Sequence, residues 1–169
     1  MEIPSTMFET YRAASKDKSR YQLNGPCFET HSGTHTGHAV ATDGKMLLHS
    51  TWPIDAMVET SERVTLASQD ARDVIKLASK NDIANPMSSL EIQSPDELPE
   101  HGKEFPGYTL RPGMNGSVLT GDSCGMFTDY PTILPTTTPQ FTWHLNPYVL
   151  KELCSALITT AGLTRDCLL

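Results

Sequence analysis

Four histidines lie between residues 31 and 49 of the sequence, at His31, His35, His38 and His49. Neutral imidazole nitrogens are good zinc ligands, so this grouping raises the hypothesis of a metal site. However, the residues fall on an expected loop and hairpin and not on one face of a helix. Cys27 is the one cysteine near them. We therefore expect no metal site and no cofactor.

A second group with chemical potential surrounds Ser123 and Cys124, with Asp122 beside them and His101 earlier in the chain. A nucleophile needs a nearby base and a group that orients the base. Residues 121–125 have a superficial likeness to the Gly-Asp-Ser-Gly context of serine proteases, but Cys124 interrupts it, and no histidine or aspartate landmark accompanies it. No glycine-rich phosphate loop is present either. The pattern favours a protein that is not an enzyme.

Composition narrows the class of protein further. The 169 residues have a net charge of −7, and 38% of them are hydrophobic. No apolar run approaches the roughly 18 to 20 residues needed to span a bilayer, and residues 1–4 do not resemble a secretory signal. We expect a cytoplasmic protein that does not enter membranes. The acidic excess is local, since residues 81–130 contain eight acidic side chains and two basic ones.

The elements that would position functional side chains begin with a hairpin. Residues 37–50 alternate between apolar and polar around Asp43 and Gly44, which predicts two strands joined by a two-residue type I′ turn. Residues 20–29 are expected to form a strand beside them. Three antiparallel strands would result.

Two helices are expected to carry basic side chains. In the first, Thr6 and Glu9 would form a capping box and the helix would run to about residue 15, with Met7, Tyr11 and Ala14 on its apolar side. In the second, Ser68 would cap the amino end. Its apolar stripe would hold Ala71, Val74, Ile75 and Ala78. The cations on the other faces of the two helices are Arg12, Lys16, Arg72, Lys76 and Lys80.

The second half of the chain contains shorter predicted elements. Strands are expected at residues 90–92, 108–110, 117–120 and 126–134. A Pro/Thr-rich stretch at residues 135–139 indicates a domain boundary, which divides the chain into domains 1–135 and 136–169. The second domain would contain a strand at residues 141–145 and a helix opened by Asn146 and Pro147.

Three motifs occur in an order that resembles one protein family. They are Arg-Tyr-Gln-Leu-Asn-Gly at residues 20–25, Val-Ala-Thr-Asp-Gly at residues 40–44, and Phe-Thr-Asp-Tyr at residues 127–130, followed by Ile-Leu-Pro at residues 133–135. This series is similar to the middle domain of the bacterial DNA polymerase III beta subunit, the sliding clamp. The resemblance implies an α+β domain of the DNA-clamp type, with helices packed on one side of antiparallel sheet and a C-terminal strand-helix extension.

The resemblance also implies a function and its sites. A clamp of this family surrounds duplex DNA without reading its sequence and tethers replication proteins, so the five cations above would face the DNA. The family's partner-peptide groove matches Leu23, Thr42, Gly44, Lys45, Met46, Leu47, Thr128, Thr132 and Ile133. Two places depart from the family, which commonly has His-Arg where this chain has Lys45-Met46, and Pro where it has Thr128.

Two functions remain open at this point. The first is a clamp-like, non-catalytic accessory protein of DNA replication that acts as a homo-oligomer, since one chain with little more than one such domain cannot close a ring alone. The second is a protein of phage or mobile-element type that keeps the clamp fold and binds or inhibits another protein through its acidic surface.

Overall fold

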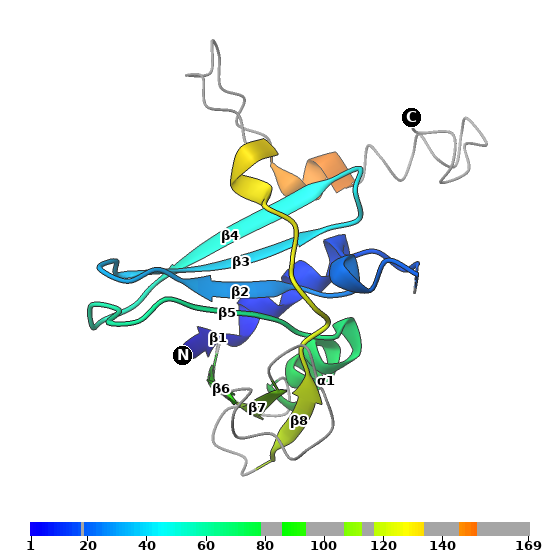
Figure 1. Ribbon diagram of the computed structural model, residues 1–169. Helices are drawn as coiled ribbons and strands as arrows, with labels where there is room; N and C mark the ends of the chain where they lie inside the picture. The colour runs from blue at the N-terminus through cyan, green and yellow to red at the C-terminus, as the bar shows by residue number, and fades with distance from the viewer. Residues whose placement is uncertain (18, 79–85, 94–106, 113–116, 134–145, 152–169) are drawn as a thin grey trace, which may run out of the picture. The chain divides into compact units, whose positions relative to one another are not determined.

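A computed structural model describes residues 1–17, 19–78, 86–93, 107–112, 117–133 and 146–151 of this chain. The chain divides into two compact units, Met1–Asp129 and Tyr130–Leu169, which are described separately. The first unit contains two four-stranded antiparallel sheets and the helices that contact them (Figure 1).

One sheet has the strand order β4-β3-β2-β5. Its strands are β2 (Cys27–Thr30), β3 (Thr36–Thr42), β4 (Leu47–Pro53) and β5 (Glu62–Thr65). Every neighbouring pair is antiparallel. The predicted hairpin is confirmed as β3 and β4. The predicted strand at residues 20–29 is wrong in its first part, because Tyr21–Leu23 forms the short 3₁₀ helix η2 and the strand begins at Cys27.

The hairpin turn differs from the predicted two-residue type. Thr42 and Leu47 are the last paired residues, so the loop contains four residues, from Asp43 to Met46. The Asp43 carboxylate accepts hydrogen bonds from the backbone N–H of Lys45 (2.9 Å) and of Met46 (3.0 Å). Gly44 has a φ of +90°, which glycine adopts without steric cost. The aspartate side chain therefore closes a wider turn by satisfying two backbone donors.

The other sheet has the strand order β1-β6-β7-β8. Its strands are β1 (Glu2–Pro4), β6 (Met87–Ile92), β7 (Gly107–Pro112) and β8 (Leu119–Asp122). The three later strands agree with the predicted positions. β1 pairs with β6 across more than eighty residues of sequence, a partnership that no local pattern indicates.

The predicted strand at residues 126–134 is wrong. Residues 123–129 lack regular secondary structure, and Tyr130–Ile133 forms the 3₁₀ helix η4. The segment 123–129 runs next to β5, at the edge of the β4-β3-β2-β5 sheet (Figure 1). The backbone N–H of Cys124 donates to the carbonyl of Thr65 (2.9 Å), and the Arg63 guanidinium donates to the carbonyl of Thr128 (3.1 Å). The Arg63 side chain therefore bonds the Thr128 carbonyl, which in a strand would accept a backbone N–H from a neighbouring strand.

The first helix, η1 (Ser5–Ala13), is a 3₁₀ helix and not the predicted α-helix. Pro4 is its N-cap and no side chain caps it, so the predicted capping box of Thr6 and Glu9 is wrong. A 3₁₀ helix repeats every three residues, which changes the buried face. Phe8 is fully buried, whereas Met7 and Tyr11 are half-buried.

The second helix, α1 (Ser68–Ala78), agrees with the predicted position. Ala71, Val74 and Ala78 are buried, and Ile75 packs against the core. The predicted N-cap is displaced, because Ser68 is already helical and its hydroxyl donates to the carbonyl of Asn24. This hydrogen bond ties the start of α1 to the segment after η2.

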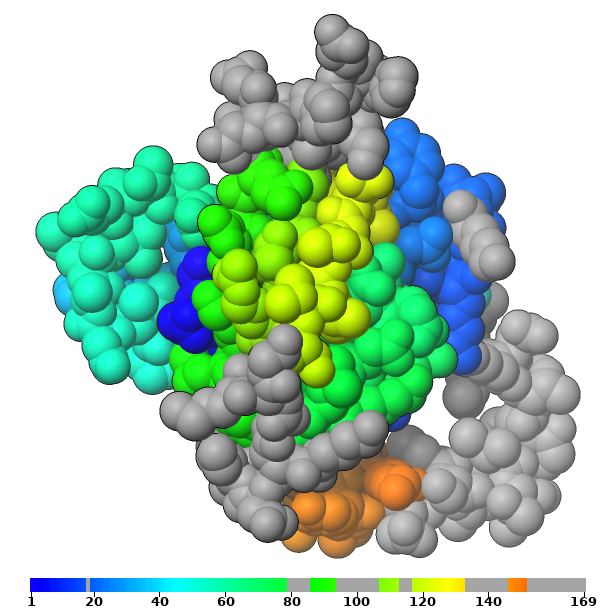
Figure 2. Space-filling model, turned by 90° about the horizontal axis from the view of Figure 1, so that it is seen from below, coloured from blue at the N-terminus to red at the C-terminus, as the bar shows by residue number. Residues whose placement is uncertain are grey.

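Both sheets and both helices contribute to one hydrophobic core. η1 contacts β3, β4 and α1, and α1 also contacts β7. The buried members are Ile3, Phe8, Phe28, Ala39, Trp52, Val64, Leu66, Ala71, Val74, Leu90, Tyr108 and Leu110. Viewed from below, α1 and the β6–β8 strands form the centre of the face (Figure 2). The predicted α+β class is confirmed, with two sheets.

The second unit is described over few residues. Residues 147–151 are helical, and the side-chain oxygen of Asn146 accepts a hydrogen bond from the N–H of Tyr148 (2.9 Å). The predicted helix opening at Asn146 and Pro147 is therefore present. The predicted strand at residues 141–145 lies outside the described residues, and the domain boundary after residue 135 stays a prediction. Within the described ranges, no helix is long and apolar enough to cross a membrane.

Candidate functional site

A pocket of about 570 Å³ lies between η1 and α1. Three of the five predicted DNA-facing cations line it, namely Arg12 from η1, Lys16 just beyond η1, and Arg72 from α1. All three side chains are exposed. Lys76 is also exposed on α1 but does not line the pocket, and Lys80 lies outside the described residues. Tertiary structure thus brings together cations that the sequence separates by almost sixty residues.

Tyr11 is the aromatic side chain of this pocket, and it was expected only as part of an apolar helix face. The guanidinium carbons of Arg12 and Arg72 each lie 5.4 Å from the centre of its ring. Cations at this distance are attracted by the negative face of an aromatic ring. The ring therefore contacts guanidinium groups from two different helices.

The cations differ in how far acidic side chains neutralise them. Arg12 is paired with Glu9, whose hydrogen bond and charge raise the pKa of Arg12. Lys76 pairs with Asp73 at 2.8 Å, and the pKa of Asp73 is lowered by hydrogen bonds from Lys76 and Gln69. Within the described part of the chain, Lys16 and Arg72 have no ion-pair partner within 4.0 Å. The pocket thus keeps positive charge available for a ligand.

Three uncharged polar groups of the lining, those of Ser15, Asn24 and Ser68, are already hydrogen-bonded within the protein. Ser68 donates to the Asn24 carbonyl, and the Asn24 amide nitrogen, in the orientation that satisfies it, donates to the Ser15 carbonyl (2.9 Å). The Ser15 hydroxyl accepts from the N–H of Asp17 (3.1 Å). These bonds fix the pocket wall, and they leave the cationic side chains as its principal groups for binding.

The predicted partner groove centres on the β3–β4 hairpin. Thr42 is buried and its hydroxyl donates to the carbonyl of Met46 (2.6 Å), while Lys45 and Met46 are exposed at the turn. Leu47 and Leu23 are half-buried. Arg20, next to η2, donates to the carbonyl of Asp43 (3.2 Å). The hairpin and the η2 segment, which hold six of the nine predicted residues, are therefore linked.

The remaining three groove residues come from residues 128–133. Thr128 belongs to the first unit and is exposed, and its carbonyl accepts the hydrogen bond from Arg63. Thr132 and Ile133 belong to the second unit. Their role in a groove stays a prediction.

An ion pair on β2 and β5 was missed by the sequence analysis. The Glu29 side chain is only 4% exposed, and its carboxylate lies 3.3 Å from Nε of Arg63 and 3.4 Å from Nε2 of His31. Glu29 and Arg63 are directly opposed across the two strands. Nη2 of the same Arg63 donates hydrogen bonds to the backbone carbonyls of Phe127 and Thr128. A buried charge therefore anchors this segment to the sheet.

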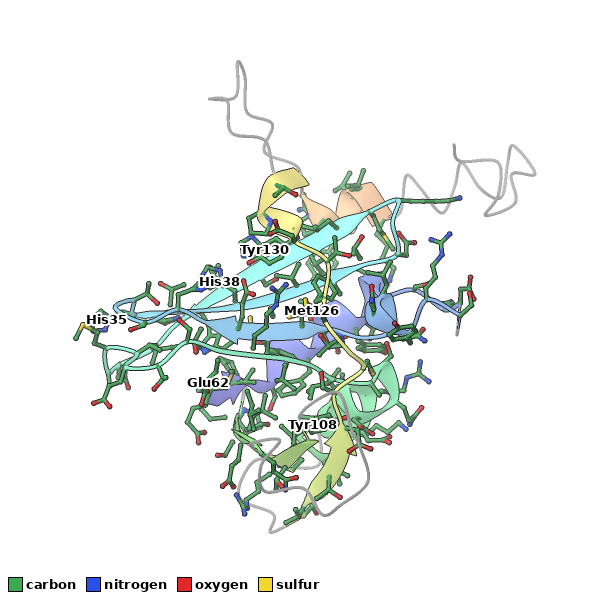
Figure 3. The ribbon with its side chains drawn as sticks, in the orientation of Figure 1. His35, His38, Glu62, Tyr108, Met126 and Tyr130 are labelled. Carbon is green, nitrogen blue, oxygen red and sulfur yellow. The ribbon has the colours of Figure 1, made fainter. Side chains whose placement is uncertain are left out.

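Three of the four histidines singled out in the sequence form a cluster, with His38 on β3, His49 on β4 and His31 just after β2. Nδ1 of His38 and Nε2 of His49 lie 3.0 Å apart, and the His31 and His38 ring centres are 5.4 Å apart. His35 immediately precedes β3 and lies apart from His38 (Figure 3). Burial, together with the neighbouring His49 and His31, lowers the pKa of His38. Among the described residues, no group of three or more side chains has the geometry to hold a metal ion.

The predicted nucleophile candidates lie in the segment beside β5. The hydroxyl of buried Ser123 accepts a hydrogen bond from the N–H of Thr65 (3.3 Å). Burial raises the pKa of the Cys124 thiol, which favours the less reactive protonated form. His101 lies outside the described residues. In the described residues, the Ser123 hydroxyl therefore links this segment to strand β5.

No protein-family model and no curated protein matches this sequence. Solved structures do match it. The DNA polymerase III beta subunit of Thermotoga maritima gives a TM-score of 0.58 at 20% identity over 81% of this chain. The sliding clamp of Bacillus subtilis gives 0.58 at 16% identity over 81%, and the beta chain of Streptococcus pneumoniae gives 0.65 at 14% identity over 99%.

These likenesses establish the fold of this chain as that of sliding-clamp structures, which confirms the predicted resemblance at the level of fold. This chain covers 34%, 33% and 41% of those three proteins' lengths. It therefore spans between a third and two fifths of the clamps that it matches.

Proposed function

We propose that this chain is a non-catalytic, clamp-like accessory protein of DNA replication, which binds or encircles duplex DNA without sequence preference. The observation that carries the proposal is the convergence of Arg12, Lys16 and Arg72 on one pocket between two helices of a clamp fold. Contacts between cations and phosphates release counterions and do not depend on the base sequence. The net charge of −7 would repel DNA from the other surfaces.

Tethering of a replication protein is the second part of the proposal. The exposed turn residues Lys45 and Met46, with half-buried Leu23 and Leu47 nearby in the linked η2 and β4 segments, offer apolar contacts and one charge. Because Lys45 and Met46 stand where the clamp family commonly has His-Arg, the preferred peptide would differ from the usual one. The chain would act as a homo-oligomer.

Retention on circular duplex DNA tests the DNA-binding function. We expect the protein to co-elute with nicked circular DNA, with binding that weakens steeply between about 50 and 200 mM salt. Replacing Arg12, Lys16, Arg72 and Lys76 by glutamine should abolish retention. Arg111→Gln is the matched control, because Arg111 is an exposed cation on β7 that pairs with Glu91. If no assembly state is retained at low salt, or the control loses as much, the proposal fails.

The overall acidity favours a second candidate function. A clamp-fold protein with eight acidic residues between 81 and 130 would bind another protein with a basic nucleic-acid site, in place of DNA. This candidate predicts capture of a basic protein at low salt by a chain that has no affinity for duplex DNA.

A further inference from the structure

We propose that a second, smaller pocket of this chain binds a lysine side chain of a partner protein, through acidic side chains and the buried hydroxyl of Thr30. The pocket has a volume of about 220 Å³ and lies between the start of β1, the end of β2 and the β4–β5 loop, residues 54–61. Figure 2 shows the dark blue start of the chain beside the turquoise β4–β5 loop, with a hollow between them. The inference goes beyond the proposed function, because this pocket shares no lining residue with the pocket between η1 and α1 or with the predicted partner groove.

Thr30 gives the pocket a polar group that the protein leaves without a partner. It is the last residue of β2 and is only 2% exposed. Alternate residues of a strand face the same side, so Thr30 faces the core side of the sheet with Phe28, opposite to Glu29. Its hydroxyl makes no hydrogen bond within the described ranges of the chain. Because a buried hydroxyl without a partner is costly, a hydrogen-bond donor that enters the pocket would be stabilised there.

The charge of the lining favours a cation. Glu2 and Glu59 are exposed, and neither has an ion-pair partner within 4.0 Å among the described residues. Glu62 also lines the pocket, but its carboxylate lies 3.6 Å from the Met1 amino group and is already paired. No lysine, arginine or histidine lines the pocket in the described part of the chain. The two unpaired carboxylates would therefore attract a positive charge.

The size and the apolar walls select a lysine side chain. Ile54 and Val58 of the β4–β5 loop are half-buried and line the pocket. Sites for small-molecule ligands usually have roughly 300 to 1,000 Å³, so this smaller volume suits a single side chain. Lysine has a compact ammonium group on an apolar stem of four carbons, and its three donors can be shared between a hydroxyl and carboxylate oxygens.

Hydrogen bonds between two loops fix the pocket wall before a ligand arrives. The backbone N–H of Gly33 donates to the carbonyl of Val58 (2.8 Å), and the Ser32 hydroxyl donates to the carbonyl of Glu59 (2.8 Å). A wall that is already ordered loses less conformational entropy on binding. Met57 of the same loop is 59% exposed and offers an adaptable apolar contact to the residues beside the lysine. We therefore assign the lysine to a protein segment and not to a free amine.

The experiment titrates the full chain with the peptide acetyl-Leu-Lys-Leu-amide and follows the methyl NMR signals of Ile54 and Val58. We expect both signals to shift until the site is saturated, and acetylation of the peptide's lysine nitrogen to remove the shift. Glu59→Gln should weaken binding about two- to fivefold, in the range for exposed charge pairs. Asp55→Asn is the matched control, because it removes one exposed charge from the same loop but does not line the pocket. Thr30→Val replaces the hydroxyl by a methyl group of similar size and should also weaken binding.

Each outcome decides one part of the inference. It is supported if the lysine peptide shifts both signals and if Glu59→Gln and Thr30→Val each weaken binding more than Asp55→Asn does. It is overturned if the lysine peptide shifts neither signal, if the acetylated peptide shifts them equally, or if the variants lose no more affinity than the control.

Two further probes test the choice of ligand. Tighter binding of the corresponding arginine peptide overturns the assignment to lysine, and tighter binding of spermidine overturns the assignment to a protein. Binding of duplex DNA by the wild type is measured separately, so that failure of either proposal leaves the other standing. Thermal melts confirm folding, and exposed Glu59 serves if Thr30→Val is unstable.

Discussion

At the scale of single residues, Arg63 connects strand β2 with the segment that contains Phe127 and Thr128. Its guanidinium lies 3.3 Å from the carboxylate of Glu29, whose side chain is 4% exposed, and it also bonds the carbonyls of Phe127 and Thr128. A buried carboxylate that loses its arginine keeps the cost of desolvation with less of the attraction that offset it, although His31 remains 3.4 Å from Glu29.

We therefore expect Arg63→Met to lower the free energy of unfolding by about 2 to 3 kcal/mol, less than for a fully buried pair because Arg63 is 40% exposed. Urea unfolding followed by circular dichroism measures this change. The matched control is Arg111→Met, which breaks an exposed pair with Glu91 and should cost below about 1 kcal/mol. Equal losses in the free energy of unfolding would show that the Glu29–Arg63 pair stabilises the fold no more than the exposed Arg111–Glu91 pair does.

At the scale of elements, the contact between α1 and the β7–β8 pair depends on Tyr108. Its hydroxyl donates to the Asp70 carboxylate in the first turn of α1, and Tyr108 lies beside this helix (Figure 3). Burial, the hydrogen bond to Asp70 and its charge raise the pKa of Tyr108, so the phenol remains a donor. A Cβ at Gly121 on β8 would lie 2.5 Å from that hydroxyl. The strand can approach the helix because this position has no side chain.

Tyr108→Phe should destabilise the fold by about 1 to 3 kcal/mol, because the half-buried Asp70 carboxylate loses its donor. A double-mutant cycle with Asp70→Ala measures the coupling between the two side chains, which we expect to exceed 0.5 kcal/mol in the usual range for contacting residues. Tyr21→Phe removes a hydroxyl from an exposed tyrosine and serves as the control. Additive effects in the cycle would rule out the Tyr108–Asp70 link as the connection between helix and sheet.

At the scale of the whole molecule, the question is how many copies assemble. The chain covers 33% to 41% of three sliding clamps of the same fold, so a closed ring of such units requires several copies in head-to-tail contact. Light scattering after size exclusion should give the mass of a closed assembly of several copies if the chain encircles DNA alone. A monomer or dimer that lacks affinity for duplex DNA would instead favour the acidic interaction protein.

Local patterns predicted the elements whose signals lie close together in the chain. The alternation around Asp43 and Gly44 predicted β3 and β4, and the apolar spacing of Ala71, Val74 and Ala78 predicted α1. The same kind of reasoning failed for η1, where a three-residue repeat replaced the α-helical one, and for residues 126–134, where Arg63 takes carbonyl groups that a strand would have paired.

The sequence by itself determined the hairpin, the second helix and the basic residues of the two helices, because propensity and periodicity act between neighbours. It indicated the fold class through the resemblance of its three ordered motifs to the sliding-clamp family. Only the tertiary structure decided that Tyr11 contacts arginines from both helices, that Glu29 is buried against Arg63, and that β1 pairs with β6. These contacts join residues far apart in the chain, and their energy arises from burial and charge that exist only once the two sheets enclose a common core.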